Sequence, residues 1–435
     1  MTRKMKDSGI EWIGEIPEDW KISKIKYVSN LNGRIGFRGY KESDLVDEDE
    51  GAITLGPPNM DDGKLNLSNC KYLSWYKYFE SPEIQLSIGD ILLVKTASVG
   101  KVAYVDNIKK EMTINPQLLI IKSRNIENKF LFYIMISDYF QNQIKMSVTG
   151  GTVPTLSQEK IKNFTIIEPS LSSQKLIAKK IDLKCSKLEE ISNIIKKQIQ
   201  ILEDYKKSII TEAVTKGLDK NVEIKDSGIE WVGEIPKHWQ VDRLKNIVNY
   251  NEQTLKETTN KNYRFKYIDI GSVEYGKGIL PLEIMTFEKA PSRARRIVKG
   301  GDIIISTVRT YLKAIAVVPK SDMPIIASTG FITLRTKGIV DQEYLKYVVQ
   351  SETFISEISS KSVGVNYPAI NATELINIKI AIPPKEERLK IISHLDKKAR
   401  LIDEAIANKQ KQLETLEEYK KSLIYEYVTG KKEVE

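Results

Sequence analysis

Apolar residues recur at a helical spacing in two long stretches of the chain, residues 174–214 and 388–428, which contain neither proline nor glycine. In the first stretch they stand at Leu188, Ile191, Ile195, Leu202, Tyr205 and Ile209. In the second they stand at Leu395, Ala399, Ile402, Ile406, Leu413 and Leu416. Polar Gln198 and Lys409 occupy the remaining seam positions. Spacings that sum to seven predict two coiled-coil helices, each about 40 residues or roughly 60 Å long.

Short apolar runs bounded by glycine and proline predict strands between these helices. Residues 91–94 and 102–105 form two such runs around a polar loop, and residues 301–318 repeat the order of Gly-Asp, apolar run, polar loop and apolar run. Residues 150–169 and 363–384 share a glycine-containing turn, a short polar stretch and an apolar run before proline. Ser157 and Asn371 begin the polar stretches, and these residue types favour a helix N-terminus.

The same elements occur twice because the sequence itself is repeated. Residues 7–20 read DSGIEWIGEIPEDW and residues 226–239 read DSGIEWVGEIPKHW, with 11 of 14 positions identical. Residues 202–215 (LEDYKKSIITEAVT) and 416–429 (LEEYKKSLIYEYVT) share 10 of 14 positions. Pro154 and Pro169 recur 214 residues later as Pro368 and Pro383. A segment of about 215 residues has therefore been duplicated, and each copy is long enough to form a domain.

Two long amphipathic helices need partners, because an apolar stripe facing water is unfavourable. The duplicate is the obvious partner of each helix, and a pseudo-twofold axis across the pair predicts antiparallel packing with a globular part at each end. The order of the repeats also predicts that the chain termini lie within about 30 Å, half the helix length. The large side chains of the repeated motif are expected to fix its loop to the domain core: Trp12, Trp20, Trp231 and Trp239.

The chain is thus predicted to have an α/β (α+β) fold with two similar globular domains, residues 1–172 and 217–385. Two helical segments, residues 173–216 and 386–435, separate them, and the second includes the C-terminal tail. A rigid spacing between two similar domains suits a two-part target. Two groups that contact the same face of a DNA duplex lie about 34 Å apart, and a rod of roughly 60 Å can hold two domains at such a spacing.

Composition excludes several classes of protein. Lys and Arg number 67 against 58 Asp and Glu, and the resulting net charge of +9 is compatible with a polyanionic partner without proving one. Cys70 and Cys185 show no CxxC spacing, which excludes a disulfide framework or a zinc cluster. No apolar run approaches 18 residues, and the N-terminal segment lacks a secretory signal. We therefore expect a cytoplasmic protein with no membrane partner.

No pattern in the sequence supports catalysis by this chain. An adenine methyltransferase needs an Asn/Asp-Pro-Pro-aromatic motif, and neither residues 56–59 (GPPN) nor residues 115–117 (NPQ) provide it. Residues 271–277 (GSVEYGK) have the spacing of a phosphate-binding loop, but Gly278 replaces the Ser or Thr that would hold magnesium. The two histidines, His238 and His394, lie far apart in sequence, and no metal site is expected.

The repeated DSGIEW(I/V)GEIP motif, the two Gly-Asp segments, the IPPxEER start of the second helix and its LEEYKKSLI ending resemble the specificity (S) subunit of type I restriction–modification systems. The resemblance covers essentially the whole chain and the order of its parts. Two helix starts depart from the family pattern. The first reads EPSLSSQKLIAKKID where the family tends to show PPxEEQ, and the second has Arg388 in place of glutamine.

The resemblance implies that residues 1–172 and 217–385 are target recognition domains, which contact the two parts of a split, asymmetric site in double-stranded DNA. The two helices would be the conserved spacer, which acts as a ruler and docks two modification subunits. Those partners bind S-adenosylmethionine and methylate adenine, and a restriction subunit with a motor and a nuclease joins the complex. The family implies no catalysis by the specificity subunit, and we expect no cofactor on this chain.

DNA recognition needs hydrogen-bonding side chains on exposed loops, with basic residues near phosphates. The loops after the two Gly-Asp pairs offer Lys95, Thr96, Ser98 and Lys101 in the first copy, and Ser306, Thr307, Arg309, Tyr311 and Lys313 in the second. The glycine-containing turns add Gly151, Thr152, Asn366 and Tyr367. Two basic clusters are either DNA contacts or solvated surface: Arg34, Arg38 and Lys41, and Arg293, Arg295 and Arg296. Arg309 suits a contact with guanine or with phosphate.

A function of a different class stays open at this point, namely a coiled-coil scaffold that binds proteins and not DNA. The sequence favours the DNA-binding function because the resemblance spans the whole chain. The two functions differ in the salt dependence of duplex binding, since phosphate contacts release counterions.

Overall fold

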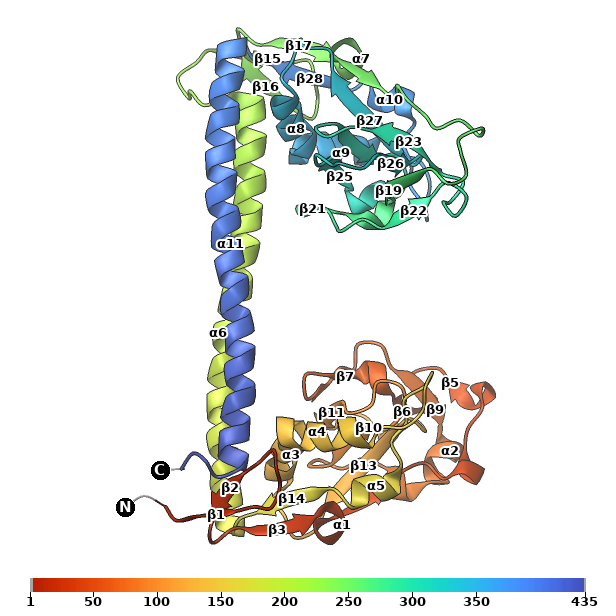
Figure 1. Ribbon diagram of the computed structural model, residues 1–435, viewed down its shortest axis with the longest axis vertical. Helices are drawn as coiled ribbons and strands as arrows, with labels where there is room; N and C mark the ends of the chain where they lie inside the picture. The colour runs from red at the N-terminus through yellow and green to blue at the C-terminus, as the bar shows by residue number, and fades with distance from the viewer. Residues whose placement is uncertain (1–2, 434–435) are drawn as a thin grey trace. The chain divides into compact units, whose positions relative to one another are not determined.

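The computed structural model describes residues 3–433, which fall into two compact units (Figure 1). Unit 1 comprises Met1–Ile195 and Lys411–Glu435, and unit 2 comprises Lys196–Gln410. Both boundaries fall inside long helices, α6 (Leu171–Lys216) and α11 (Lys385–Val428), so each helix contributes one end to each unit. The two predicted helices are confirmed, and they begin two residues and one residue before the predicted segments 173–216 and 386–435.

Unit 1 is built on two four-stranded sheets. The first, which is antiparallel, has the order β11 (Val102–Tyr104), β10 (Ile91–Val94), β13 (Leu118–Ser123) and β4 (Ser29–Asn32). The second has the order β12 (Met112–Ile114), β6 (Gly51–Leu55), β9 (Lys71–Ser74) and β5 (Leu45–Val46), and its β12–β6 pair is parallel. Successive residues of β10 and β13 alternate between two hydrophobic clusters, so both faces of the first sheet are buried.

Unit 2 repeats this arrangement. Its first sheet has the order β18 (Val248–Tyr250), β27 (Phe331–Thr336), β24 (Ile303–Ser306) and β25 (Ile315–Val317). Its second has the order β22 (Ile284–Thr286), β19 (Arg264–Ile268), β26 (Ile325–Ser328) and β23 (Ala294–Val298), with β19 and β26 parallel. The predicted α+β class and the internal repeat are therefore confirmed.

The fourth strand of the second sheet lies at opposite edges in the two units. In unit 1, β5 pairs with β9, whereas in unit 2 β23 pairs with β26, the strand that corresponds to β12. The segment of unit 1 that corresponds to β23 forms a 3₁₀ turn, Pro82–Ile84. Proline cannot donate to a strand ladder, so Pro82 disfavours a strand at this edge.

In each unit, two helices cover the face of the first sheet that points away from the second sheet. They are α3 (Asn128–Ile136) and α4 (Asp138–Ser147) in unit 1, and α8 (Gln342–Gln350) and α9 (Glu352–Ser360) in unit 2. The Tyr133 hydroxyl donates to Asp182 of α6 at 2.5 Å, and the Tyr347 hydroxyl donates to Asp396 of α11 at the same distance. The two globular parts are thus joined to the long helices by equivalent hydrogen bonds. Within residues 3–433, no helix is long and apolar enough to cross a membrane.

The ends of α6 and α11 pack antiparallel within unit 2, as predicted. Lys206 of α6 pairs with Asp403 of α11 at 2.7 Å, and Lys409 of α11 donates to Gln198 of α6 at 2.6 Å. Residue numbers therefore increase along α6 in the direction in which they decrease along α11. The buried seam of α6 differs from the predicted one. Ile191 and Tyr205 are 44% and 48% exposed. Half-buried side chains instead lie one residue after each of these positions, at Ser192 and Lys206. Ile199, one residue after the predicted seam position Gln198, is half-buried as well.

In unit 1, the start of α6 and the end of α11 share one core. Ile177, Ile181 and Cys185 lie in the same cluster as Ile424 and Val428. Burial raises the pKa of the Cys185 thiol to about 11, as expected of an idle thiol in an apolar site.

A β-hairpin in each unit contacts the long helices. In unit 1, β7 (Met60–Asp61) and β8 (Lys64–Leu65) flank a turn from which Asp62 pairs with Lys420 at 2.8 Å and Lys64 pairs with Glu189 at 2.6 Å. In unit 2, β20 (Val273–Glu274) and β21 (Gly278–Ile279) flank Tyr275, whose ring lies 5.5 Å from the ammonium group of Lys207. The GSVEYGK string is therefore a hairpin, and its sequence similarity to a phosphate-binding loop is coincidental.

The repeated DSGIEW motif forms a small hairpin beside each long helix. The hairpins are β1 (Met5–Asp7) with β2 (Glu15–Pro17), and β15 (Ile224–Asp226) with β16 (Glu234–Pro236). Trp20 and Trp239 are 1% exposed and lie in the cores, as predicted. The expectation for Trp12 is wrong, because its side chain is 37% exposed and its carbonyl accepts from Tyr425 at the loop surface.

The described ends of the chain meet on the same tryptophan, as the closed order of the repeats predicts. The Arg3 guanidinium lies 5.1 Å from the Trp20 ring, and a Cβ added to Gly430 would stand 3.0 Å from that ring. The strand pair β3 (Lys21–Lys24) with β14 (Thr165–Glu168) then leads into α6, and β17 (Gln240–Arg243) with β28 (Lys379–Ile382) leads into α11.

Candidate nucleic-acid interface

The structure brings together two loops of unit 1, residues 95–101 and residues 149–155, that lie far apart in sequence. Residues 95–101 follow β10, and residues 149–155 form a hairpin turn after α4. Thr96 forms a β-bridge with Thr155, and the Ala97 amide donates to the Pro154 carbonyl at 2.9 Å. We call residues 95–101 and 149–155 together platform 1.

Unit 2 builds the same arrangement from its own copies of the two loops. Val308 forms a β-bridge with Ala369, and the Ile370 amide donates to the Thr307 carbonyl at 2.9 Å. The Thr310 amide donates to the Pro368 carbonyl at 3.3 Å. We call residues 306–313 and 363–369 together platform 2. The sequence predicted each of these loops separately, and the structure shows that they are paired.

Each platform ends in a tight turn whose tip faces solvent. Thr149 and Thr155 exchange two backbone hydrogen bonds, as do Val363 and Ala369. Gly150 turns the chain with φ +99°, and a Cβ at this position would lie 2.5 Å from the Val153 carbonyl, so only glycine fits. The predicted residues Gly151, Thr152, Asn366 and Tyr367 are all exposed. The sequence reasoning missed Val365, which is 99% exposed between Gly364 and Asn366.

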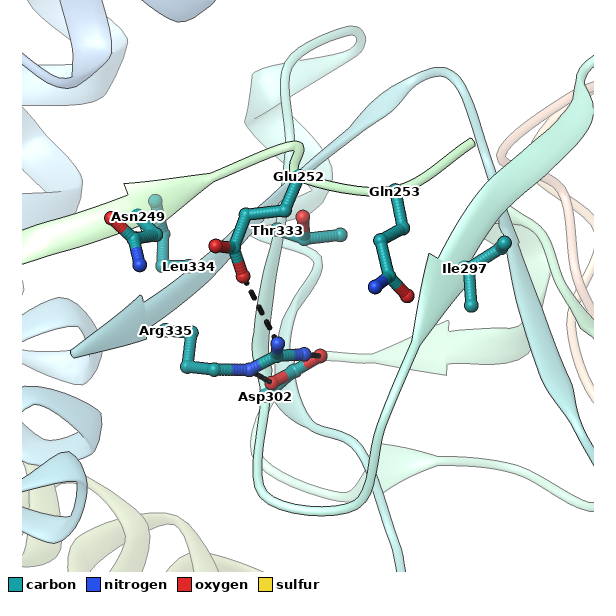
Figure 2. A pocket seen from close by; sticks show the side chains of 8 residues that line it. All are labelled: Asn249, Glu252, Gln253, Ile297, Asp302, Thr333, Leu334 and Arg335. Carbon is teal, nitrogen blue, oxygen red and sulfur yellow. Dashed lines mark hydrogen bonds and ion pairs between the residues drawn. The ribbon is translucent and has the colours of Figure 1, made fainter. Parts of the chain in front are cut away.

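The Gly-Asp pairs hold the strands that precede the platforms. Asp302 is buried, accepts from the Lys299 amide, and binds Arg335 through both carboxylate oxygens at 2.6 and 2.7 Å. Figure 2 shows this pair together with Glu252, which lies 3.0 Å from the same guanidinium. Asp302 is thus a structural anchor, and its position 33 residues before Arg335 gave no sign of this in the sequence.

Asp90 is the corresponding anchor in unit 1, with a weaker partner. It accepts from the Ser87 amide at 2.8 Å, and the ammonium group of Lys122 lies 3.5 Å away. Burial raises the pKa of the Asp90 carboxyl, while the Ser87 amide and Lys122 act in the opposite direction. Both units keep the aspartate, but its basic partner is Lys122 in unit 1 and Arg335 in unit 2.

The short helices after the turns begin where the sequence indicated. The Ser157 hydroxyl accepts from the Lys160 amide at the start of α5 (Gln158–Lys162). Asn371 precedes α10 (Ala372–Leu375), and the Glu374 carboxylate accepts from the Asn371 amide at 3.3 Å. These caps fix the chain directly after each platform.

Platform 2 presents a ring and two cations. The Arg309 guanidinium lies 4.9 Å from the Tyr367 ring, and Tyr311 is exposed beside it in the loop. The ammonium group of Lys313 lies 5.2 Å from the ring of Tyr275. Ser306 and Thr307 face inward, since their hydroxyls donate to the carbonyls of Val308 and Gly330. Tyr275 is a further residue that the sequence reasoning missed.

Platform 1 presents smaller and less constrained groups. Ser98 and Lys101 are exposed, and Lys95 and Thr96 are half-buried at the loop base. In the part of the chain that the structure describes, neither Lys95 nor Lys101 lies within ion-pairing distance of a carboxylate. Both ammonium groups are therefore available to an external anion.

The basic cluster of unit 1 is largely engaged within the protein. Arg34 is 7% exposed, donates to the Ile114 carbonyl at 3.2 Å and to the Thr113 hydroxyl at 3.3 Å, and its pKa is lowered by burial. Arg38 pairs with Glu83 at 3.4 Å. Lys41 is exposed. A DNA contact from Arg34 requires a change of conformation, while Lys41 needs none.

The basic cluster of unit 2 lies on the edge strand β23 and the residues before it. Arg293 is exposed, and the Arg295 guanidinium lies 4.8 Å from the Phe287 ring. The Arg296 Nε atom is enclosed and has no hydrogen-bond partner within residues 3–433, and burial lowers the pKa of this arginine. No group of three or more His, Cys, Asp or Glu residues among residues 3–433 is placed to hold a metal ion.

Comparison with known proteins identifies relatives over nearly the full length of the chain. The chain matches the type I restriction modification DNA specificity domain twice, over residues 17–203 and 236–418. It is 27% identical over 437 residues to the type I restriction enzyme MjaVIII specificity subunit of Methanocaldococcus jannaschii, covering 96% of this chain and 93% of that protein. The MjaIX specificity subunit of the same organism is 28% identical over 440 residues, with 97% and 96% covered.

A solved structure shows the same fold. Its description concerns complex assembly and conformational transition of the type I R-M system, and the matched chain has a TM-score of 0.67 at 17% sequence identity. The match covers 95% of this chain and 98% of that one.

Proposed function

Because the chain belongs to the type I restriction–modification DNA specificity family, we propose that it recognises a bipartite, asymmetric site in double-stranded DNA, with one part contacted by each unit. The observation that supports this proposal is the repeated platform. Two units share one loop framework, held by equivalent bridges and hydrogen bonds, but present different side chains. A common framework with different side chains is suited to two different DNA sequences.

The candidate DNA contacts divide by chemistry. Lys41, Lys95, Lys101 and Arg293 suit phosphate contacts, which fix the position of a protein on the duplex. Hydroxyl, amide and aromatic groups at the platform tips suit base edges. These are Thr96, Ser98 and Thr152 in unit 1, and Tyr311, Asn366 and Tyr367 in unit 2.

The chain would act through partners and not by its own chemistry. We propose that two modification subunits dock on it, bind S-adenosylmethionine and methylate adenine, and that a restriction subunit completes the complex. Long helices with charged outer faces suit such docking. No cofactor is assigned to this chain.

The first test measures duplex binding by the chain in complex with its modification subunits at 50 and 200 mM salt. Phosphate contacts predict that affinity falls by about 10³-fold or more if six or more phosphates are neutralised. Affinity that is independent of salt would favour a scaffold that binds only proteins. The isolated chain is expected to show neither methylation nor cleavage of the same duplex.

The second test addresses the helices as a ruler. Four residues inserted after Gln198, with four inserted after the facing Lys409, add about one turn to each helix. The gap between the two parts of the methylated site is expected to lengthen by one or more base pairs, as read from the host genome by long-read sequencing. An unchanged gap in a variant that still methylates DNA would contradict the ruler.

A further inference from the structure

The first loop of each platform, residues 95–101 or residues 306–313, holds two non-consecutive residues in the left-handed backbone region. In platform 1 they are Ala97 at φ +67° and Gly100 at φ +96°. In platform 2 they are Arg309 at φ +51° and Lys313 at φ +50°. The first residue of each pair directly follows the bridge residue, Thr96 or Val308. The positions correspond in the two loops, although platform 2 has one more residue between them and forms a 3₁₀ turn there, Thr310–Leu312.

Glycine adopts this conformation without strain, whereas residues with a Cβ seldom do. Platform 1 uses its smallest residues at these positions. Platform 2 instead has arginine and lysine there, which lack the short polar side chain that makes asparagine tolerable. Such strain is found at functional sites, where the surrounding structure holds it in place, so these two side chains are candidates for a functional role.

The two cations of platform 2 differ in their surroundings. Lys313 is engaged inside unit 2, because its ammonium group lies over Tyr275 and 4.0 Å from Glu352. Arg309 is exposed and stacks on Tyr367. Within residues 3–433, no carboxylate lies in ion-pairing distance of Arg309, and its guanidinium donates no hydrogen bond. Its fork of N–H donors is therefore held in place by a ring and available to an external acceptor.

We infer that Arg309 is the residue with which unit 2 recognises a guanine, and that Tyr367 positions it. The inference rests on the proposed function. A guanidinium fork matches the N7 and O6 acceptors of guanine in the major groove. A stacked, strained arginine is already restricted before DNA binds, which reduces the ordering cost of the contact. Unit 1 has Ala97 at the equivalent position and must recognise its own part of the site with other groups.

The test uses the full chain with its modification subunits. The wild-type site is first defined by mapping methylated adenines in the host, and duplexes with a single base-pair change are then compared by competition. Arg309→Gly relieves the backbone strain and removes the fork. We expect its thermal stability to be unchanged or higher, while discrimination at one G·C pair falls roughly 5- to 150-fold. All other positions of the site are expected to be retained.

Arg309→Lys separates a base contact from a phosphate contact. Lysine keeps the charge and loses the planar fork, so we expect the same G·C position to stay poorly discriminated while overall affinity recovers. A loss of affinity in Arg309→Gly that is equal for all the duplexes, and that Arg309→Lys restores, would instead assign Arg309 to phosphate and overturn the inference. Retention of every position of the site in Arg309→Gly would overturn it as well.

Two further variants serve as controls. Asp62→Gly relieves the same kind of backbone strain outside both platforms and is expected to leave the recognised site unchanged. Tyr367→Ala is expected to reduce discrimination at the same G·C pair as Arg309→Gly, by a smaller factor, because it removes only the support. A wild-type complex that methylates no defined site would contradict the proposed function itself, and is thereby distinguishable from failure of the inference alone.

Discussion

The two units build the same platform but stabilise it with different interactions. Asp302 in unit 2 is held by both nitrogens of the Arg335 fork, whereas Asp90 in unit 1 faces a single ammonium group at 3.5 Å. The hairpin of unit 1 contacts the helices through ion pairs, and that of unit 2 through the Tyr275 ring. Duplication has therefore preserved the pairing of the two platform loops, while the interactions that hold the surrounding structure differ between the copies.

The largest expected difference concerns the two buried aspartates. Asp302→Asn leaves Arg335 without its main partner, so we expect a loss of about 3 kcal/mol in the unfolding free energy. Asp90→Asn keeps an acceptor for the Ser87 amide and removes a buried charge, so the expected change is within about 1 kcal/mol. Urea denaturation, with hydrogen exchange of residues 87–94 and 299–306, measures both. Equal losses would show that the two anchors do not differ.

A second difference concerns the buried tryptophan of each repeated motif. The Trp239 indole donates to Glu387 at 3.1 Å, and His238 contacts the same carboxylate at 2.8 Å. The Trp20 indole nitrogen, in contrast, is buried and has no hydrogen-bond partner among the residues that the structure describes. Ser173 occupies the position of unit 1 that corresponds to Glu387, at the start of α6. Ser173→Glu is expected to stabilise unit 1 by about 1 kcal/mol, and Glu387→Ala to destabilise unit 2 by about 1–3 kcal/mol. Thermal unfolding of the two variants, with Ser172→Glu as the matched control, tests the sign of each change.

A third difference is the response of the two hairpins to salt. Raising the ionic strength from 0.1 to 1 M shortens the Debye length from about 10 to 3 Å. Exchange of amide hydrogens in residues 60–65 should therefore accelerate, corresponding to about 0.5–1 kcal/mol, because exposed ion pairs are weak and screened. Residues 273–279 should change less, since a ring contact holds them. Equal acceleration in both hairpins would contradict this assignment.

The smallest expected effect is a pH dependence from Asp90. A carboxyl group whose pKa is raised by folding contributes stability that is present below its unfolded pKa, near 3.8, and is lost as pH rises through the folded value. Asp90→Asn should remove this decline. Denaturation of the wild type and the variant between pH 4 and 7 measures the difference, and parallel curves would exclude a contribution from Asp90.

The sequence predicted those features that depend on local periodicity. The α11 seam was correct from Leu395 to Leu416 because each apolar position is matched by a heptad. The α6 seam was shifted at Ile191 and Tyr205, since isoleucine at 194, 195, 199 and 201 allows more than one apolar stripe. The strands around the Gly-Asp loops were predicted correctly because their apolar runs are short and bounded by turns.

The candidate interface was predicted only in part. Loop residues such as Arg309 and Tyr367 were identified separately, but their stacking depends on the bridge between Val308 and Ala369, which are 61 residues apart. Arg34 was selected for its charge, and nothing in its neighbours indicated that β12 would enclose it. The left-handed conformations of Ala97 and Arg309 could not be predicted, because neither residue type favours them.

The most direct measurement is a map of methylated adenines in a host that contains the modification subunits, with the wild-type chain and with one variant of each platform. The variants are Ser98→Ala with Thr152→Ala in platform 1, and Arg309→Gly in platform 2. We predict a two-part site with a fixed gap, in which the first variant alters one part and the second variant alters the other. A single uninterrupted site, or two variants that alter the same part, would contradict the division of recognition between the two units.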